Sequence, residues 1–182
     1  GWDRASYAPT GSDTVTGGVT VSLLLQGVAQ DTGQGMDTLV GIEHLTGTEF
    51  DDVLTGDGGD NWIWGGSDAR GVTGNHTISA GAGNDVVEVG TGNHLLDGGT
   101  GIDTLSLFGN GSDITTAGVT FSLVLQGAAQ ETEQGLMTTS GFENVSGSVH
   151  DDSIDGDSSD NVLLGDQGND LLNGGNGNDT LY

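Results

Sequence analysis

Aliphatic residues recur with a period of nine along much of this chain of 182 residues. The residues after Ser146 are the clearest case, because four nine-residue units follow one another there and each has Ile or Leu at its eighth position. The same phase is found upstream, and the complete set is Leu45, Leu54, Ile63, Ile78, Val87, Leu96, Leu105, Val145, Ile154, Leu163, Leu172 and Leu181. Strand alternation points such a residue inward and its two neighbours outward. Each unit is therefore predicted to form a short strand after a six-residue turn.

The nonapeptides fall into consecutive runs that share this pattern. They are Gly47–Thr55, Gly56–Trp64, Ala80–Glu88, Val89–Asp97, Gly98–Ser106, Gly147–Asp155, Gly156–Leu164, Gly165–Asn173 and Gly174–Tyr182. An enlarged half-turn, Gly65–Ser79, interrupts the first run. Two nonapeptides make one full turn and place successive strands ~4.8 Å apart. This pattern predicts an all-β parallel solenoid whose core is a narrow aliphatic ladder between two sheets.

A second, longer period divides the chain into two tandem units of about 100 residues. Residues 1–66 align with residues 101–166 without a gap, and 31 of the 66 positions are identical. The first unit, 1–100, has an irregular part at 1–46 and a nonapeptide roll at 47–100. The second, 101–182, has an irregular part at 107–146 and a roll at 147–182. Because no Pro- or Ser-rich linker separates them, we expect one continuous solenoid.

Each irregular part contains one segment with alternating apolar residues. Gly18–Gly27 reads GVTVSLLLQG and Gly118–Gly127 reads GVTFSLVLQG. This alternation predicts a strand longer than those of the nonapeptides, flanked by one large loop. The glutamines and glycines that align between the two copies indicate shared architecture rather than a binding site.

The composition adds a requirement for a cation. The chain has 27 acidic residues and only two basic ones, for a formal net charge of −25, and it contains no cysteine. With 32% hydrophobic residues, it has little apolar area to offset chain entropy unless something neutralises its carboxylates. The same charge excludes nucleic acid as a partner. No apolar segment is long enough for membrane insertion, and the chain reads as a piece of a larger parent protein.

Asp or Asn recurs at the sixth position of the nonapeptides. In an 18-residue turn such residues meet in pairs, which are Asp85 with Asp103, Asp152 with Asp170, and Asn161 with Asp179. Stacked carboxylates ~5 Å apart repel by roughly 3 kcal/mol, and a hard dication reverses that sign. Calcium fits best because it accepts many oxygen ligands at flexible geometry, whereas magnesium is stricter and zinc prefers Cys or His. Asp and Asn are also common in ordinary turns, but turn preference does not explain one position recurring through consecutive units.

These units resemble the RTX (repeats-in-toxin) calcium-binding module of secreted bacterial proteases, lipases, toxins, adhesins and alginate epimerases. Gly98–Ser106 (GGTGIDTLS) and Gly174–Tyr182 (GGNGNDTLY) match its motif at every defined position. The resemblance covers about half the chain directly. It implies a right-handed parallel β-roll, several Ca²⁺ ions, folding on calcium binding, and type I secretion from a Gram-negative bacterium.

Carried over by position, the resemblance assigns calcium to the sixth-position residues and to carbonyls of the glycine loops. The residues concerned are Asp52, Asn61, Asp85, Asp103, Asp152, Asn161, Asp170 and Asp179, with Gly81, Gly83, Gly99, Gly101, Gly168, Gly175 and Gly177. Asp57, Asp60, Asp157 and Asp160 could compensate for the weaker Asn61 and Asn161, and Asp166 could supply another carboxylate. His76 and His94 stand where Asp is expected. They mark lapses in the calcium ladder, or alternatively a pair that holds a transition metal or senses pH. Arg70 argues against a site in the enlarged half-turn.

The sequence leaves two functions open and argues against a third. The first is a calcium-binding structural module of a larger secreted protein. The second is a calcium-dependent glycan- or surface-binding module of the adhesin type, because Trp62 and Trp64 flank the inward Ile63 and should present indoles that stack on a polysaccharide. Packing of these indoles against a neighbouring element is the alternative. An enzyme is not expected, because no nucleophile and base can be paired.

Overall fold

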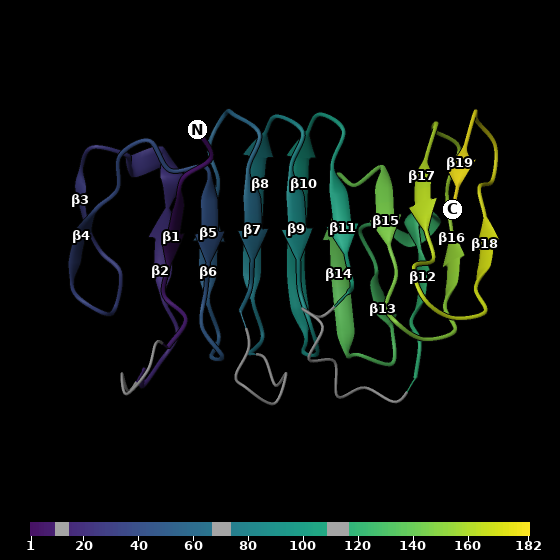
Figure 1. Ribbon diagram of the computed structural model, residues 1–182, viewed down its shortest axis with the longest axis horizontal. Coiled ribbons are helices and arrows are strands. Elements are labelled where there is room, and N and C mark those ends of the chain that lie inside the picture. Colours follow the sequence, from purple (N-terminus) through teal and green to yellow (C-terminus); the bar gives the residue numbers. More distant parts are fainter. Residues whose placement is uncertain (10–14, 67–73, 109–116) are drawn as a thin grey trace.

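The structure, a computed structural model, describes residues 1–9, 15–66, 74–108 and 117–182, and nearly all of its regular elements are strands. Arg70 and the rest of segment 67–73 of the enlarged half-turn lie outside these described residues. Figure 1 shows the strands side by side along the long axis, from β3 and β4 at one end to β18 and β19 at the other. Within the described residues, no helix is both long and apolar enough to cross a bilayer.

One parallel sheet runs through most of the molecule and contains strands of both sequence units. In spatial order it consists of β1 (Arg4–Ser6), β5 (His44–Thr46), β7 (Trp62–Trp64), β9 (Val86–Glu88), β11 (Thr104–Ser106), β15 (Asn144–Ser146), β17 (Val162–Leu164) and β19 (Thr180–Leu181). The pairing of β9 with β11 joins the first unit to the second.

Three further sheets hold the remaining strands. The six-stranded sheet has the order β13 (Ala129–Glu131), β14 (Leu136–Ser140), β10 (His94–Thr100), β8 (Thr77–Ala82), β6 (Val53–Thr55) and β2 (Thr20–Ser22). The three-stranded sheet has β12 (Thr120–Ser122), β16 (Ser153–Asp155) and β18 (Leu171–Asn173), and an antiparallel pair is formed by β3 (Ala29–Asp31) and β4 (Met36–Thr38). Apart from β3–β4 and β13–β14, all strand pairs are parallel, which confirms the predicted β-roll.

The register follows the predicted turn length wherever nonapeptides run without interruption. Equivalent residues of adjacent coils, such as Asp85 and Asp103, are then 18 positions apart. The separation rises to 24 across the enlarged half-turn, between Asn61 and Asp85. It rises to 33 between Val19 and Asp52 and to 40 between Asp103 and Glu143, where the irregular parts are inserted. Adjacent coils therefore stay in register, because the residues on either side of each insertion occupy equivalent positions and are hydrogen-bonded to each other.

The core is the aliphatic ladder predicted from the sequence. Ten of its twelve members are at most 1% exposed, and each such burial is worth about 1.5–3 kcal/mol. Leu172 is partly buried, and Leu181 is 42% exposed because β19 is the edge strand of its sheet. In the irregular parts Val21 and Phe121 take the inward position, opposite Leu54 and Ile154.

The long strand predicted for Gly18–Gly27, and its copy at Gly118–Gly127, is wrong. The chain forms only β2 and then turns into a 3₁₀ helix, η1 (Leu23–Leu25), which leaves Leu25 43% exposed. The reason is that the Gln30 side chain pairs with the backbone of Ser22, accepting from its N–H at 2.8 Å and donating to its C=O at 3.0 Å. These side-chain bonds replace the ladder bonds of a neighbouring strand. The second unit repeats the arrangement with η3 (Leu123–Leu125) and Gln130.

Candidate metal centre

The sixth-position side chains line one edge of each coil and link it to the coil before. Oδ1 of Asp103 accepts a hydrogen bond from the Asp85 N–H at 2.8 Å, and Oδ1 of Asp85 accepts one from the Asn61 N–H at 2.7 Å. Asp170 does the same for Asp152 at 2.9 Å, and Asp179 for Asn161 at 3.0 Å. The structure therefore brings together all three pairs that the spacing predicted.

Asp85 and Asp103 each keep one oxygen without a hydrogen-bond partner. Both side chains are buried, and Oδ2 of each is fully enclosed and makes no hydrogen bond among the described residues. A buried carboxylate oxygen without a partner carries a full desolvation cost. These two oxygens are therefore candidate ligands for a cation.

The pKa values of both carboxyls are raised, and the main cause in each case is burial. Burial and, to a smaller extent, the charges of Asp103, Asp60 and Asp57 raise the pKa of Asp85 from 3.8 to about 6, although the hydrogen bond from Asn61 opposes the shift. Burial also raises the pKa of Asp103, with smaller contributions from Glu143 and Asp97. A bound dication would remove both effects, because it supplies the missing partner and the missing positive charge.

Asp170 and Asp179 hold the equivalent places in the second roll. Each is half-buried, and each carboxylate lies directly over the glycine that opens its nonapeptide. A Cβ added at Gly165 would collide with Oδ2 of Asp170, and one at Gly174 with Oδ2 of Asp179. The first-position glycine is therefore needed to make room for the carboxylate.

Asp52 and Asp152 are placed differently, because the protein itself uses both of their oxygens. Oδ1 of Asp52 accepts from the Val19 N–H at 2.7 Å, and Oδ2 accepts from the Thr48 N–H at 2.7 Å. The Thr48 hydroxyl donates to Oδ1 at 2.9 Å. Asp152 repeats this arrangement with Val119 and Ser148. A metal ion at either carboxylate would have to displace existing hydrogen bonds.

Asn61 and Asn161 are also engaged within their own loops. Each Oδ1 accepts from the N–H of the second-position residue, Asp57 or Asp157, at 2.8 Å. Nδ2 of Asn161 donates to the Glu143 carbonyl at 2.7 Å. Both side chains are buried and hold their turns closed.

The residue at the second position of each nonapeptide distinguishes two kinds of loop. In one kind the sixth-position side chain accepts a hydrogen bond from the second-position N–H, and in the other it does not. Where the second-position residue is Thr, Ser or Asp with ordinary φ, its N–H points at the sixth-position side chain and closes the site. In the loops of Asp85, Asp103 and Asp179 it is a glycine with φ of +113°, +100° and +87°, and in the loop of Asp170 it is Asp166 with φ of +66°. These loops are open, because no hydrogen bond runs from that N–H to the carboxylate. All seven glycines assigned to calcium have positive φ: Gly81, Gly83, Gly99, Gly101, Gly168, Gly175 and Gly177.

The remaining predicted carboxylates serve the turns. Asp57 and Asp157 accept from the N–H two residues later, at 2.9 and 2.7 Å. Asp60 and Asp160 accept from the N–H of the fifth-position residue one coil later, at 2.8 and 2.7 Å. Asp166 accepts from the Ser146 hydroxyl at 2.8 Å. The fifth-position role was not predicted, although Asp or Asn stands at that position in every nonapeptide except Gly98–Ser106, which has Ile102.

The rings of His76 and His94 stack on one side of the roll, as their spacing of 18 residues predicts. Their ring centroids lie 5.2 Å apart and their planes differ by 12°. Nδ1 of His94 accepts from the His76 N–H at 3.1 Å, so His94 takes over the sixth-position ladder bond, and its Nε2 contacts the Gly90 carbonyl at 3.1 Å. Nδ1 of His76 lies 3.3 Å from Oδ2 of Asp52. Both nitrogens of His94 are thus engaged, which favours a lapse in the calcium ladder over a transition-metal pair.

No three His, Asp or Glu side chains converge as a metal cluster in the part of the chain that the structure describes. Calcium takes roughly six to eight oxygens, whereas a stacked pair offers two carboxylates. The other ligands must be backbone carbonyls and water, and the glycine loops fit this requirement. Gly99 and Gly101 pack so closely on the carbonyls of Gly81 and Gly83 that an added Cβ would collide with either oxygen.

Comparison with protein families gives a match to the RTX calcium-binding nonapeptide repeat at residues 37–69, 70–105 and 146–181. This is more than half of the chain. The chain belongs to the RTX calcium-binding repeat family. A comparison with curated proteins found no match.

Membership in the RTX family establishes the ligand. RTX repeats bind Ca²⁺, several ions in each module, so calcium is the partner of this roll. The repeat is a structural calcium-binding module that is generally not catalytic, and it is typical of secreted bacterial proteins. The matched segments contain all the open carboxylates described above.

Proposed function

We propose that this chain is a structural module of a larger secreted bacterial protein, and that it folds when it binds calcium outside the cell. The observation that carries this proposal is the buried pair of Oδ2 atoms of Asp85 and Asp103, for which the described part of the chain provides no hydrogen-bond partner. Millimolar calcium outside the cell is enough to fill sites of roughly 10⁻⁴–10⁻³ M affinity. A low-calcium cytosol would leave the chain unfolded and therefore ready for type I export from a Gram-negative cell.

The proposed ligands fall into two groups. Carboxylates of the open loops, Asp85, Asp103, Asp170 and Asp179, hold calcium together with the carbonyls of their glycine turns. The closed loops of Asp52, Asn61, Asp152 and Asn161 stabilise the roll through hydrogen bonds and take calcium only where it displaces them. This division rests on the second-position φ angles and on the hydrogen bonds of the closed loops.

The two sequence units are proposed as two segments of one roll, divided near residue 100. The eight-stranded sheet that contains strands of both units supports this proposal. A single cooperative unfolding transition is expected, because β9 pairs with β11 and β10 pairs with β14 directly across the boundary. Two separate calorimetric transitions would instead indicate two independent domains.

A calcium titration of the full chain tests the proposed function. Starting in chelator, added calcium should induce a β spectrum in circular dichroism, and calorimetry should count several ions. Magnesium at the same concentration should do less, because it demands a strict octahedron and keeps its water. A β spectrum that stays unchanged when calcium is removed would contradict calcium-driven folding.

A further inference from the structure

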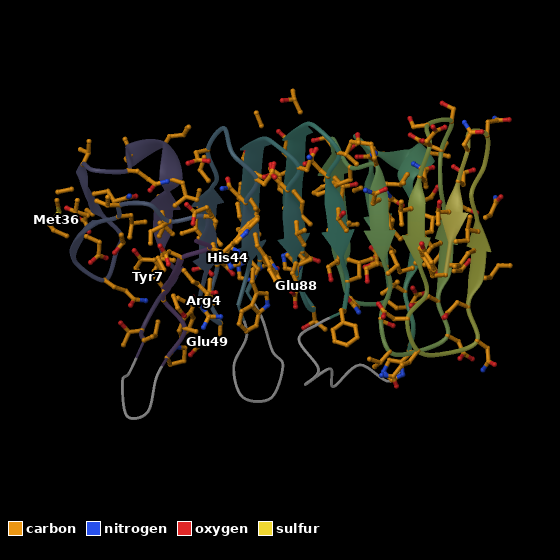
Figure 2. All side chains as sticks on the ribbon, turned by 45° about the horizontal axis from the view of Figure 1, so that its top comes forward. Arg4, Tyr7, Met36, His44, Glu49 and Glu88 are labelled. Carbon is orange, nitrogen blue, oxygen red and sulfur yellow. The ribbon has the colours of Figure 1, made fainter. Side chains whose placement is uncertain are left out.

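A row of aromatic and charged side chains crosses the outer face of the eight-stranded sheet near its N-terminal end. The register places Arg4 of β1, His44 of β5 and Trp62 of β7 next to one another, and Trp64 beside Glu88 in the parallel row. In Figure 2, Arg4, His44 and Glu88 lie together on this part of the sheet. The calcium loops lie at the ends of these strands, so this face is separate from the metal centre.

These side chains surround a hollow of about 220 Å³, which is lined by Arg4, His44, Trp62, Trp64 and Glu88. The His44 ring packs at a tilt against two indoles, with centroid distances of 5.4 Å to Trp62 and 5.1 Å to Trp2. This volume is below the roughly 300–1,000 Å³ of pockets for drug-sized ligands. It suits a single small ring.

Two features of the hollow are unexplained by the fold. Trp62 is 45% exposed and Trp2 63% exposed, so neither indole serves mainly as core. Strand β17 of the second unit forms with Val162 and Leu164 at the places of Trp62 and Trp64, so the strand does not need indoles. Within the described residues, Nε2 of His44 is buried and has no hydrogen-bond partner.

We propose that this hollow is a carbohydrate site that takes one neutral pyranose ring of a glycan. An indole offers a large apolar surface for the C–H face of a sugar, and polar groups at the rim fix its hydroxyls. Nε2 of His44, the Arg4 guanidinium and the Glu88 carboxylate are such groups, and a sugar hydroxyl would satisfy the buried nitrogen. This assignment goes beyond calcium-dependent folding and uses none of the calcium loops.

The charges of the residues that line the hollow favour a neutral sugar. Arg4 and Glu88 carry opposite charges, so these two residues give the lining no net charge that would favour a charged ligand of either sign. A uronate would meet Glu88 and a chain with a formal net charge of −25. A quaternary ammonium ion would gain from the aromatic rings but would be repelled by Arg4.

Calorimetric titration in saturating calcium tests the site. The probes are soluble hexasaccharides of glucose, mannose, galactose and N-acetylglucosamine, with oligogalacturonate and tetramethylammonium as charged alternatives. Trp62→Val and Trp64→Leu introduce the residues of the second unit, so each variant should keep its strand. The matched control is Val162→Ala on the same face of the second unit, and circular dichroism in calcium confirms folding of every variant.

We expect at least one neutral hexasaccharide to bind, and each Trp substitution to weaken its binding at least about tenfold. Val162→Ala should leave the dissociation constant within about twofold of the wild-type value. The assignment is overturned if no neutral probe binds, if only a charged probe binds, or if folded Trp62→Val and Trp64→Leu bind as tightly as the wild type. Because folding is measured separately, loss of sugar binding in a folded variant leaves the calcium function intact.

Discussion

Replacing Asp85 with asparagine should change stability in opposite directions with and without calcium. Asparagine is already used at this position of the repeat in Asn61 and Asn161, and its Oδ1 can still accept the Asn61 N–H that Asp85 accepts at 2.7 Å. The substitution removes the buried charge on Oδ2, which has no hydrogen-bond partner among the residues that the structure describes. It also removes one proposed calcium ligand. The first effect stabilises the calcium-free roll, and the second destabilises the calcium-bound one.

The size of the first effect follows from the titration of Asp85. A rise in its pKa from 3.8 to about 6 corresponds to about 3 kcal/mol at full strength. Solvent around this narrow roll screens part of that energy, so we expect Asp85→Asn to gain about 1–2 kcal/mol without calcium. In saturating calcium a site filled at a hundred times its dissociation constant contributes about 2.7 kcal/mol. We therefore expect a loss of up to about 2–3 kcal/mol there.

The pH dependence has a definite sign. Between 3.8 and about 6 the folded calcium-free protein holds more protons at Asp85 than the unfolded chain does. The stability that this group contributes is therefore complete below the unfolded pKa and is lost as the pH rises through about 6. Asp85→Asn should flatten that decline.

Two unfolding experiments measure the effect. Urea unfolding followed by circular dichroism applies in saturating calcium, and folding induced by trimethylamine oxide applies in chelator. Asp52→Asn is the matched control, because Asp52 occupies the same repeat position with both oxygens hydrogen-bonded. It should lose about 1–3 kcal/mol under both conditions. Asp85→Asn lowering stability equally with and without calcium would refute the reasoning, because Asp85 would then be an ordinary turn residue.

Two other perturbations test the ladder and the glycine turns. Burial and the nearby His76 lower the pKa of His94 from 6.5 to about 4, so the stability it contributes is present above 6.5 and is lost as the pH falls toward 4. In calcium, the free energy of unfolding of His94→Asn should therefore fall less than that of the wild type between pH 7 and pH 5. Urea unfolding measures it, and an equal fall in both proteins would contradict this. Gly99→Ala forces a side chain at φ +100° against the Gly81 carbonyl and should cost at least about 2 kcal/mol. Gly58→Ala, which has open space, should cost less than about 1 kcal/mol, and equal thermal midpoints for the two variants would show that the close packing of the coils is unimportant.

The sequence predicts the repeating part of the fold well, because one short-range rule generates it. Each aliphatic residue of the ladder needs only a nine-residue unit and a strand of three residues, so periodicity alone locates ten of the buried side chains. The same rule fails at Leu25, where alternation continues in the sequence although the strand ends at Ser22. The cause is the Gln30 side chain, eight residues away from Ser22, and hydrophobic alternation carries no signal for a side chain that replaces a strand.

The metal loops were predicted only in part, because their chemistry depends on backbone φ as well as on residue type. Aspartate at the sixth position looks the same in the sequence whether or not its second oxygen is used. Thr48 and Gly81 at the second position distinguish the loop of Asp52 from that of Asp85. That signal is present in the sequence where glycine or threonine stands at this position, since glycine tolerates the left-handed region and threonine does not. It is absent for Asp166, whose residue type is the same as that of Asp57 and Asp157 in closed loops. The contact between His44 and Trp62 was harder to foresee, since it joins side chains of different strands.

The sixth position therefore has two separable roles, one for each oxygen of its carboxylate. Oδ1 accepts the N–H of the preceding coil, and a histidine can replace it, because Nδ1 of His94 makes the same bond to His76. The roll can thus pass through a position without charge and without metal. Oδ2 is the oxygen left for calcium, and it is left only where the second-position N–H turns away. We infer that the roll depends on every sixth-position acceptor, whereas calcium enters without displacing a hydrogen bond at Asp85, Asp103, Asp170 and Asp179. Calcium stoichiometry should then follow the number of open loops rather than the number of nonapeptides.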